Sequence, residues 1–189
     1  MTPLKRLFDL VAASGGLILL ALPMGLIAAL VKFTSEGPVL YWSDRVGRDN
    51  RIFRMPKFRT MRCGAPVVAT HLLQDPRCHL TLVGHFLRTT SLDELPQLFC
   101  ILNGDLSFVG PRPALYNQDD LIALRTRAGV HGLVPGLTGW AQIHGRDELA
   151  IPVKVQLDAY YLKNRSLLLD MEILLRTPIK VLRGDGVSH

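Results

Sequence analysis

The stretch that decides the fold is TTSLDELPQLF, residues 89–99, in the middle of the chain. Ser91, followed three residues later by Glu94 and then by an apolar run, predicts the start of a helix. Pro96 fits only the first turn of a helix, so it places the start at the same point. Asp93 and Glu94 then lie at the positive end of the helix dipole, where phosphate groups bind readily.

Two interpretations of this stretch remain open from the sequence. Two acids at a helix start, with Arg88 before them and Arg112 after them, suit a phosphoryl-transfer site. Alternatively, Glu94 only closes a capping box and Asp93 is an ordinary first-turn acid. The same choice applies to Arg112, which two prolines bracket in a stiff turn. A guanidinium held in this way suits bidentate phosphate binding, although a surface arginine in a turn is the simpler alternative.

Composition limits the classes of protein to consider. The 189 residues suffice for one domain, and 48% of them are hydrophobic. This fraction and the mean hydropathy of +0.22 suggest a membrane element. The net charge of +6 indicates an anionic partner, such as lipid headgroups or nucleotide phosphates. No basic run alternates with aromatic residues, which argues against a nucleic-acid partner. The three cysteines form no C-x-x-C pair, so a disulfide framework or zinc site is not expected.

The uncharged run over residues 10–31 is long enough to span a bilayer. It is too long for a signal peptide and has no clear cleavage site. Pro23 predicts a kink inside the run. Basic residues flank both ends, whereas a spanning helix usually has them on one side. A spanning helix and a kinked helix that enters and leaves by the same face therefore both fit the residues.

A β-hairpin is predicted next. Residues 39–46 and 51–61 are rich in β-branched and aromatic residues and flank the turn at 47–50. Pro56 places the second strand at a sheet edge or ends it early. Basic residues crowd the hairpin, and for most of them a solvated or headgroup-facing surface is the preferred interpretation. Lys57 and Arg59, near a strand end, are the better phosphate candidates.

The remaining segments complete a mainly helical α+β chain. Residues 64–77 are expected to form a mobile loop, for which a role as a lid is conceivable. Residues 166–183 predict either an interfacial amphipathic helix or a core helix with a solvated edge, kinked by Pro178. Further helical segments are predicted at 80–88, 95–102 (ended by Asn103-Gly104), 113–128 and 153–162.

Taken together, these segments resemble the monotopic bacterial phosphoglycosyl transferases, the sugar transferase family that begins glycoconjugate assembly on a polyprenyl carrier. The resemblance covers nearly the whole chain in the family's order, and the chain looks like the minimal catalytic module. Residues 55–56 and 143–144 depart from the commoner pattern without touching the Asp-Glu pair. The matching segments are residues 5–9, 57–61, 88, 91–97, 104–113, 135–142, 145–146 and 157–161.

The resemblance implies a fold and a location. Residues 1–35 would form a re-entrant membrane helix broken near Pro23, with both ends cytoplasmic. Residues 36–189 would form a membrane-associated catalytic domain, in which a small β-hairpin and interfacial amphipathic helices surround the active site. The expected location is the cytoplasmic face of the bacterial inner membrane. Membrane lipids are expected partners, and an apolar membrane-facing surface allows a homodimer.

The resemblance also implies a reaction. Asp93 would attack the β-phosphate of a UDP-sugar, expel UMP and hold the phosphosugar covalently until polyprenyl (undecaprenyl) phosphate takes it. Glu94 would be a ligand of the Mg²⁺ that the family needs. A carboxylate is an accepted covalent nucleophile, and the helix end and the arginines are expected to favour its charged form. The expected phosphate contacts are Arg88, Arg112, Arg146, Lys57 and Arg59.

Two rival functions can be weighed from the residues. A basic, membrane-anchored binding module without catalysis gives no reason for two arginines to gather around the Asp-Glu pair. A polytopic carrier transferase needs several spanning helices, and the sequence contains one long uncharged run.

Overall fold

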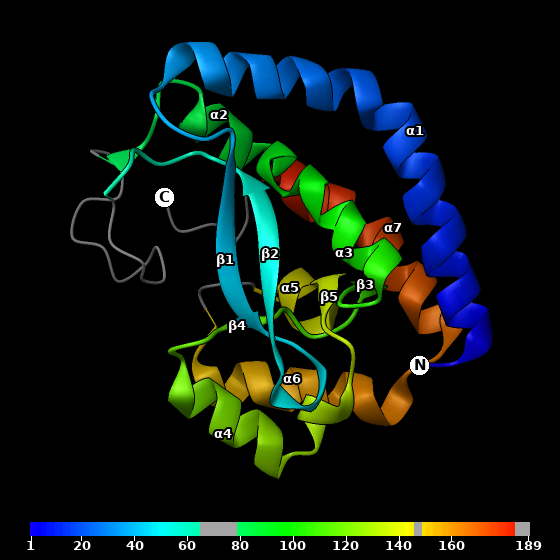
Figure 1. Cartoon of the computed structure of the whole chain (residues 1–189). Coiled ribbons are helices and arrows are strands. Elements are labelled where there is room, and N and C mark those ends of the chain that lie inside the picture. The colour runs from blue at the N-terminus through cyan, green and yellow to red at the C-terminus, as the bar shows by residue number, and fades with distance from the viewer. Residues whose placement is uncertain (65–78, 146–148, 184–189) are drawn as a thin grey trace.

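A computed structural model of the chain describes residues 1–64, 79–145 and 149–183, with side chains through residue 180. The chain is mainly helical and contains two small sheets. The helix α1 (Pro3–Thr34) arches around one side of the molecule, and the strands lie between this arch and the helices at the opposite end (Figure 1). The predicted α+β class with a small hairpin is therefore confirmed.

α1 is a single bent helix. It begins after Thr2, whose hydroxyl accepts a hydrogen bond from the backbone N–H of Lys5 at 3.3 Å. Pro3 occupies the first turn, where a missing N–H costs nothing. Pro23 lies inside the helix, which continues to Thr34 and curves between two arms (Figure 1). The implied break near Pro23 is thus a bend in a continuous helix.

Both arms of α1 pack on the same globular body. Ala13 in the first arm belongs to a buried cluster with Ile101. Ile27 and Val31 in the second arm join another buried cluster with Phe58. Among the described residues, α1 is the one helix whose length and composition suffice to cross a membrane. Its outer face exposes large apolar side chains, namely Leu4, Leu7, Val11, Ile18, Leu19, Leu22, Leu26, Leu30 and Phe33.

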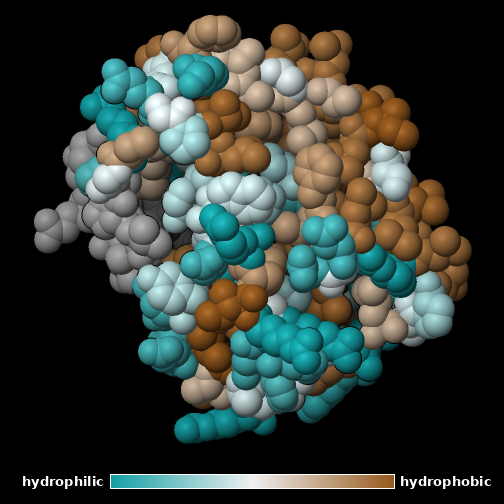
Figure 2. All heavy atoms as spheres, viewed as in Figure 1, coloured by the Kyte–Doolittle hydropathy of each residue, from teal (hydrophilic) through white to brown (hydrophobic). Residues whose placement is uncertain are grey.

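The apolar and polar surfaces are separated in space. Figure 2 shows hydrophobic residues over the α1 arch and hydrophilic residues over the opposite end of the molecule. Such an extended apolar surface is unusual on a soluble monomer and is typical of an interaction or membrane surface.

The predicted hairpin is confirmed. β1 (Leu40–Val46) and β2 (Ile52–Phe58) pair antiparallel around the short 3₁₀ helix η1 (Arg48–Asn50), and the order β2-β1-β4 places β2 at the sheet edge. Pro56, which cannot donate to a neighbouring strand, therefore lies on an edge strand, as predicted. The third strand is β4 (Ala114–Leu115), which follows the central stretch 89–99 in the sequence and pairs antiparallel with β1.

The predicted helix start at Ser91 is confirmed, with Asp93 and Glu94 in the first turn, but the helix that begins there is a short 3₁₀ helix. α2 (Gly84–Thr89) is followed by the 3₁₀ helix η4 (Leu92–Gln97) and by α3 (Leu98–Asn103). Ser91 adopts a left-handed conformation with φ 57° and makes no side-chain capping bond. The capping box, the plainer of the two interpretations of Glu94, is therefore not formed, and Ser91 makes the turn between two short helices. The predicted end is confirmed, since Gly104 terminates α3 with φ 91°.

Two closely paired strands lie next to the segment that carries Arg112. β3 (Ser107–Val109) pairs parallel with β5 (Gly136–Thr138). A Cβ on Gly136 would overlap the backbone nitrogen of Gly110, so only glycine allows the two backbones to approach this closely. Gly110, which directly follows β3, is therefore held against Gly136 at the start of the segment that carries Arg112.

The C-terminal half forms the opposite end of the molecule and one flank of the core (Figure 1). Residues 113–128 are helical only over α4 (Asp119–Arg127), because the segment before it forms β4. In α7, Ile173 is buried while Leu175 and Ile179 are exposed, so this helix has both a core face and an exposed apolar edge. The remaining elements are η5 (Val130–Gly132), α5 (Trp140–Ile143), α6 (Ile151–Asn164) and α7 (Leu167–Arg183).

Candidate active site

Three separate parts of the chain meet at Glu94. Lys57 comes from the end of β2, Glu94 from η4, and Arg112 from the turn after β3. One carboxylate oxygen of Glu94 accepts hydrogen bonds from Lys57 Nζ at 2.6 Å and from an Arg112 guanidinium nitrogen at 2.7 Å. Lys57 Nζ also lies 3.9 Å from an Asp93 carboxylate oxygen. The side chain of Glu94 is therefore committed to two cations and not to a capping box.

Arg88 completes the charged cluster. Its Nε donates to the Thr60 hydroxyl at 3.0 Å, which orients the guanidinium. Burial lowers the pKa of Arg88, while the negative charges of Asp93 and Glu94 act in the opposite direction. Five of the residues predicted from the sequence are thus brought together, namely Lys57, Arg88, Asp93, Glu94 and Arg112.

The two adjacent carboxylates have opposite electrostatic behaviour. Burial raises the pKa of Asp93 to about 6, the charge of Glu94 adds to this shift, and Lys57, Arg88 and Arg112 oppose it. Burial also acts against ionisation of Glu94, but Arg112 and Lys57 outweigh it and hold the pKa of Glu94 well below its usual range. The expectation that nearby cations favour the charged form of Asp93 is confirmed in direction, since Lys57, Arg88 and Arg112 all lower its pKa, but desolvation outweighs them and the net shift is upward.

The two acids therefore differ in their charge state. Glu94 stays ionised and binds the cations Lys57 and Arg112. Asp93 is predominantly ionised at pH 7, yet it lies in a buried site where its charge is poorly solvated, being only 6% exposed. Pairs of neighbouring carboxylates with separated pKa values are typical of sites in which one group reacts and the other stabilises charge.

The other predicted site residues lie elsewhere or outside the described part. Arg59, which directly follows β2, is buried. Its guanidinium donates to the carbonyl oxygen and to the hydroxyl of Ser35, each at 2.8 Å, just after the end of α1. No pattern in the sequence predicts this contact, which joins the end of α1 to the residue after β2. Phosphate binding by Arg59 stays a prediction. Arg146 and residues 65–78 of the predicted loop lie outside the described residues.

The residues fit one way of binding Mg²⁺. Within residues 1–64, 79–145 and 149–183 no group of three or more metal-ligating side chains is found. A cage built from protein ligands alone is therefore not formed by these residues. Mg²⁺ is commonly held by one or two carboxylates together with substrate phosphates and water. The adjacent carboxylates of Asp93 and Glu94 fit this second mode.

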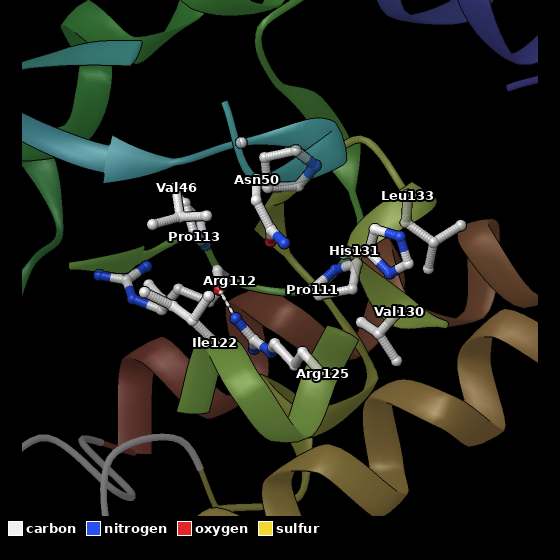
Figure 3. Close-up of a pocket in the computed structure, with 13 residues that line it drawn as sticks. Val46, Asn50, Pro111, Arg112, Pro113, Ile122, Arg125, Val130, His131 and Leu133 are labelled. Carbon is white, nitrogen blue, oxygen red and sulfur yellow. Dashed lines mark hydrogen bonds between the residues drawn. The ribbon is translucent and has the colours of Figure 1, made fainter. Parts of the chain in front are cut away.

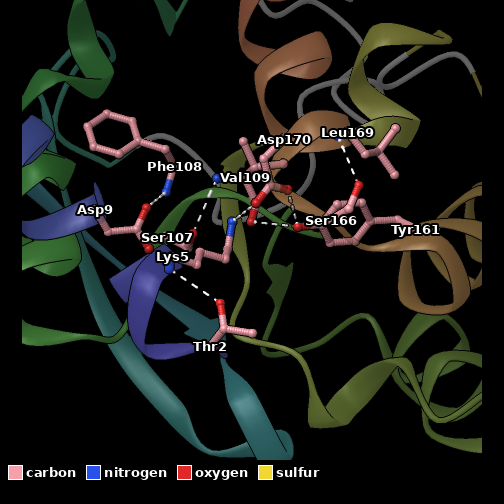
Figure 4. A network of polar contacts seen from close by, with 10 residues as sticks. All are labelled: Thr2, Lys5, Asp9, Ser107, Phe108, Val109, Tyr161, Ser166, Leu169 and Asp170. Carbon is pink, nitrogen blue, oxygen red and sulfur yellow. Dashed lines mark hydrogen bonds and ion pairs between the residues drawn. The ribbon is translucent and has the colours of Figure 1, made fainter. Parts of the chain in front are cut away.

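A polar network joins the first turns of α1 to the strand that precedes Arg112 (Figure 4). Lys5 pairs with Asp170 of α7 at 2.7 Å, and the Tyr161 hydroxyl donates to the other oxygen of Asp170 at 2.6 Å. The fully buried Asp9 accepts from the backbone N–H of Phe108 at 3.2 Å. The first turns of α1 are thus bound to α7 and to β3.

Comparisons with known proteins agree with the resemblance found in the sequence. A family model described as bacterial sugar transferase matches residues 1–184. The uncharacterized sugar transferase EpsL of Bacillus subtilis is 41% identical over 186 residues, which cover 98% of this chain and 91% of that protein. The undecaprenyl-phosphate galactose phosphotransferase of Salmonella typhimurium is 39% identical over 97% of this chain, which spans 41% of the relative's length. The UDP-glucose:undecaprenyl-phosphate glucose-1-phosphate transferase of Escherichia coli is 38% identical over 94% of this chain, which spans 40% of the relative. The chain is a transferase and belongs to the bacterial sugar transferase family.

Proposed function

We propose that this chain transfers a phosphosugar from a UDP-sugar to polyprenyl (undecaprenyl) phosphate and releases UMP. The observation that carries the proposal is a buried Asp93 beside the Glu94 carboxylate that Lys57 and Arg112 hold. Relatives named as transferases of sugar phosphates from UDP-sugars to undecaprenyl phosphate support the substrate class. Transfer to this carrier would initiate glycoconjugate synthesis.

In the first step, a carboxylate oxygen of Asp93 attacks the β-phosphorus of the UDP-sugar. A bond forms between this oxygen and the β-phosphorus, and the bond from the β-phosphorus to the bridging oxygen breaks. UMP leaves with that oxygen, and the phosphosugar stays on Asp93 as an acyl phosphate diester. Carboxylates are established nucleophiles towards phosphorus.

In the second step, a phosphate oxygen of the polyprenyl phosphate attacks the same phosphorus atom. The bond to Asp93 breaks, the carboxylate is regenerated, and a polyprenyl-diphosphate sugar is released. Because phosphoryl transfer depends chiefly on positioning and charge neutralisation, the cations Lys57, Arg88 and Arg112 are proposed to hold the diphosphate oxygens. Arg146 is proposed as a further phosphate contact.

Glu94 is proposed to hold Mg²⁺ together with substrate phosphate oxygens. The bound ion would neutralise charge on the diphosphate, as divalent cations do in other phosphoryl transfers. Glu94 also keeps Lys57 and Arg112 near the place where that charge develops. Its low pKa ensures that it is ionised throughout the working range of the enzyme.

The pH dependence of UMP release tests the state of Asp93. Because the nucleophile must be ionised, kcat/KM is expected to rise with pH up to about 6 and to level off above it, following the pKa of about 6. Below that point it falls about tenfold per pH unit. Glu94 adds no second step there, since its pKa lies well below this range. A profile that stays flat from neutral pH down to about pH 4.5 would contradict a buried Asp93 nucleophile.

A re-entrant α1 at the cytoplasmic face is the proposed membrane topology. It is supported by the packing of both arms of α1 on one body and by the apolar outer face of the bend. An enzyme placed at the headgroup level reaches both a water-soluble donor and a lipid-embedded acceptor.

Cysteine labelling in sealed inverted vesicles tests this topology. Thr2→Cys and Glu36→Cys, at exposed positions on either side of α1, are made in a background without the native cysteines. Both are expected to react with a membrane-impermeant reagent added from the cytoplasmic face. One protected end would show that α1 crosses the bilayer, and labelling after detergent lysis controls for access.

The experiment that tests the function is an assay of UMP release by the purified chain in a nanodisc. Polyprenyl phosphate, Mg²⁺ and a panel of UDP-sugars are supplied, with EDTA as the control. UMP release with one sugar, lost with EDTA, is the expected result and names the donor. A folded, lipid-bound protein that releases no UMP from any donor would favour the non-catalytic binding module.

A further inference from the structure

Side chains from α4 and α6 contact the turn that carries Arg112 near its two ends. Asp158 and Tyr161 lie one turn apart on α6. The Tyr161 hydroxyl lies 3.4 Å from the carbonyl oxygen of Val109, at the start of the turn. At its end, Arg125 donates from one guanidinium nitrogen to the carbonyl oxygen of Arg112 at 2.7 Å (Figure 3).

Asp158 orients the Arg125 guanidinium that binds the carbonyl oxygen of Arg112. One of its carboxylate oxygens accepts from Arg125 Nε at 2.9 Å and from another guanidinium nitrogen at 2.6 Å. Asp158 is 1% exposed and Arg125 is 7% exposed, so both side chains are held inside the protein. The planar fork of an arginine allows one residue to bind a carboxylate on one side and a backbone carbonyl on the other.

Stability alone does not account for this pair. Replacing a buried ion pair by apolar side chains is often neutral or stabilising, because charges are costly to remove from water. The Arg125–Asp158 pair instead directs its remaining donor to the backbone of Arg112, whose side chain holds Glu94 at 2.7 Å. The contacts therefore run from α6 through α4 to the cluster around Glu94.

The first turns of α1 reach the same turn by another route. Tyr161 donates to Asp170, and Asp170 pairs with Lys5 of the membrane helix (Figure 4). The turn from Val109 to Arg112 is thus held by the helices of the globular body and is linked to the helix that meets the membrane.

We propose that Arg125 and Asp158 are positioning residues for Arg112, and that they set the place of its guanidinium relative to Glu94 and the donor diphosphate. Neither residue touches the reacting atoms. Their effect on turnover rests on the proposed function, whereas their effect on the backbone of residues 109–115 does not.

The activity test is a double-mutant cycle on UMP release. Arg125→Lys keeps the charge but lacks the fork that serves both acceptors, so it is expected to lower turnover about 10- to 100-fold, as small misplacements in active sites do. In an Arg112→Lys background, where the positioned group is already altered, it is expected to cost less than about twofold. Equal losses in both backgrounds would assign Arg125 a structural role and overturn the proposal.

A second readout does not depend on activity. Amide hydrogen exchange of residues 109–115, followed by mass spectrometry, is expected to become faster in Arg125→Lys. The matched control is Tyr160→Phe on the same helix, which alters a ring that is 47% exposed and is expected to leave both exchange and turnover unchanged. If Arg125→Lys does not fold, Asp158→Asn takes its place. Unchanged exchange overturns the proposal, while absence of UMP from the parent chain counts against the proposed function only.

Discussion

Asp93→Asn is expected to abolish UMP release, with a loss of at least about 1,000-fold in kcat/KM. An amide has the shape of the carboxylate but cannot form the covalent bond to phosphorus. Burial is the main cause that raises the pKa of Asp93, so the folded protein disfavours its charge. A neutral amide should therefore be accommodated, and the melting temperature is expected to stay at or above that of the parent. This combination separates a lost nucleophile from a lost fold.

The matched control for this variant is Asp105→Asn. Asp105 is exposed and follows α3, close in sequence to the site but without a contact to the Asp93–Glu94 cluster in the described residues. Its substitution is expected to leave UMP release unchanged. Retention of more than about a tenth of the parent rate by Asp93→Asn would contradict a covalent role for this residue.

Glu94→Gln is expected to give the second largest effect, a loss of at least about 100-fold in UMP release. It removes the negative charge that holds Lys57 and Arg112 and the proposed contact with Mg²⁺. The free energy of unfolding at neutral pH is expected to fall by about 1–3 kcal/mol, because charged hydrogen bonds to a largely buried carboxylate are lost. Unlike Asp93→Asn, this variant therefore loses both activity and stability.

The difference in unfolding free energy between the parent and Glu94→Gln should become smaller as the pH falls. The folded pKa of Glu94 is lowered, so its contribution is fully present above the unfolded value of about 4.3 and declines as pH falls below it. Urea unfolding of parent and Glu94→Gln at neutral pH and near pH 3.5 measures this change. Glu172→Gln, which breaks an exposed pair with Arg176, is the control and is expected to alter neither property. A gap between parent and Glu94→Gln that does not narrow in acid would argue against an ionised Glu94 as the anchor.

Local patterns in the sequence predicted the features that local chemistry decides. The hairpin and the edge position of Pro56 follow from the strand residues, the turn and a missing backbone donor. The end of α3 at Gly104 follows from the conformational freedom of glycine. A site that joins Arg88 and Arg112 to the Asp-Glu pair was one of two interpretations of the residues, and the resemblance favoured it. The place of Lys57 beside that pair was implied only by the resemblance, because no local rule joins a strand to a helix that is far from it in sequence.

The errors have a common physical cause. The capping box fits the spacing of Ser91 and Glu94, but the Glu94 side chain is taken by cations from positions 57 and 112, far along the chain. The neighbouring cations do favour the charged form of Asp93, but the burial that outweighs them is a tertiary property that the sequence does not reveal. The pairing of Arg125 with Asp158 was missed for the same reason, since the two residues lie on different helices.

The proposed mechanism requires Asp93 to carry the phosphosugar as a covalent intermediate. Intact-protein mass spectrometry after incubation with the UDP-sugar and Mg²⁺, without polyprenyl phosphate, detects this intermediate. We expect a mass increase equal to one phosphosugar, mapped to the peptide that contains Asp93, absent in Asp93→Asn and lost when polyprenyl phosphate is added. UMP release that requires the acceptor from the start, with no adduct at any time, would contradict it.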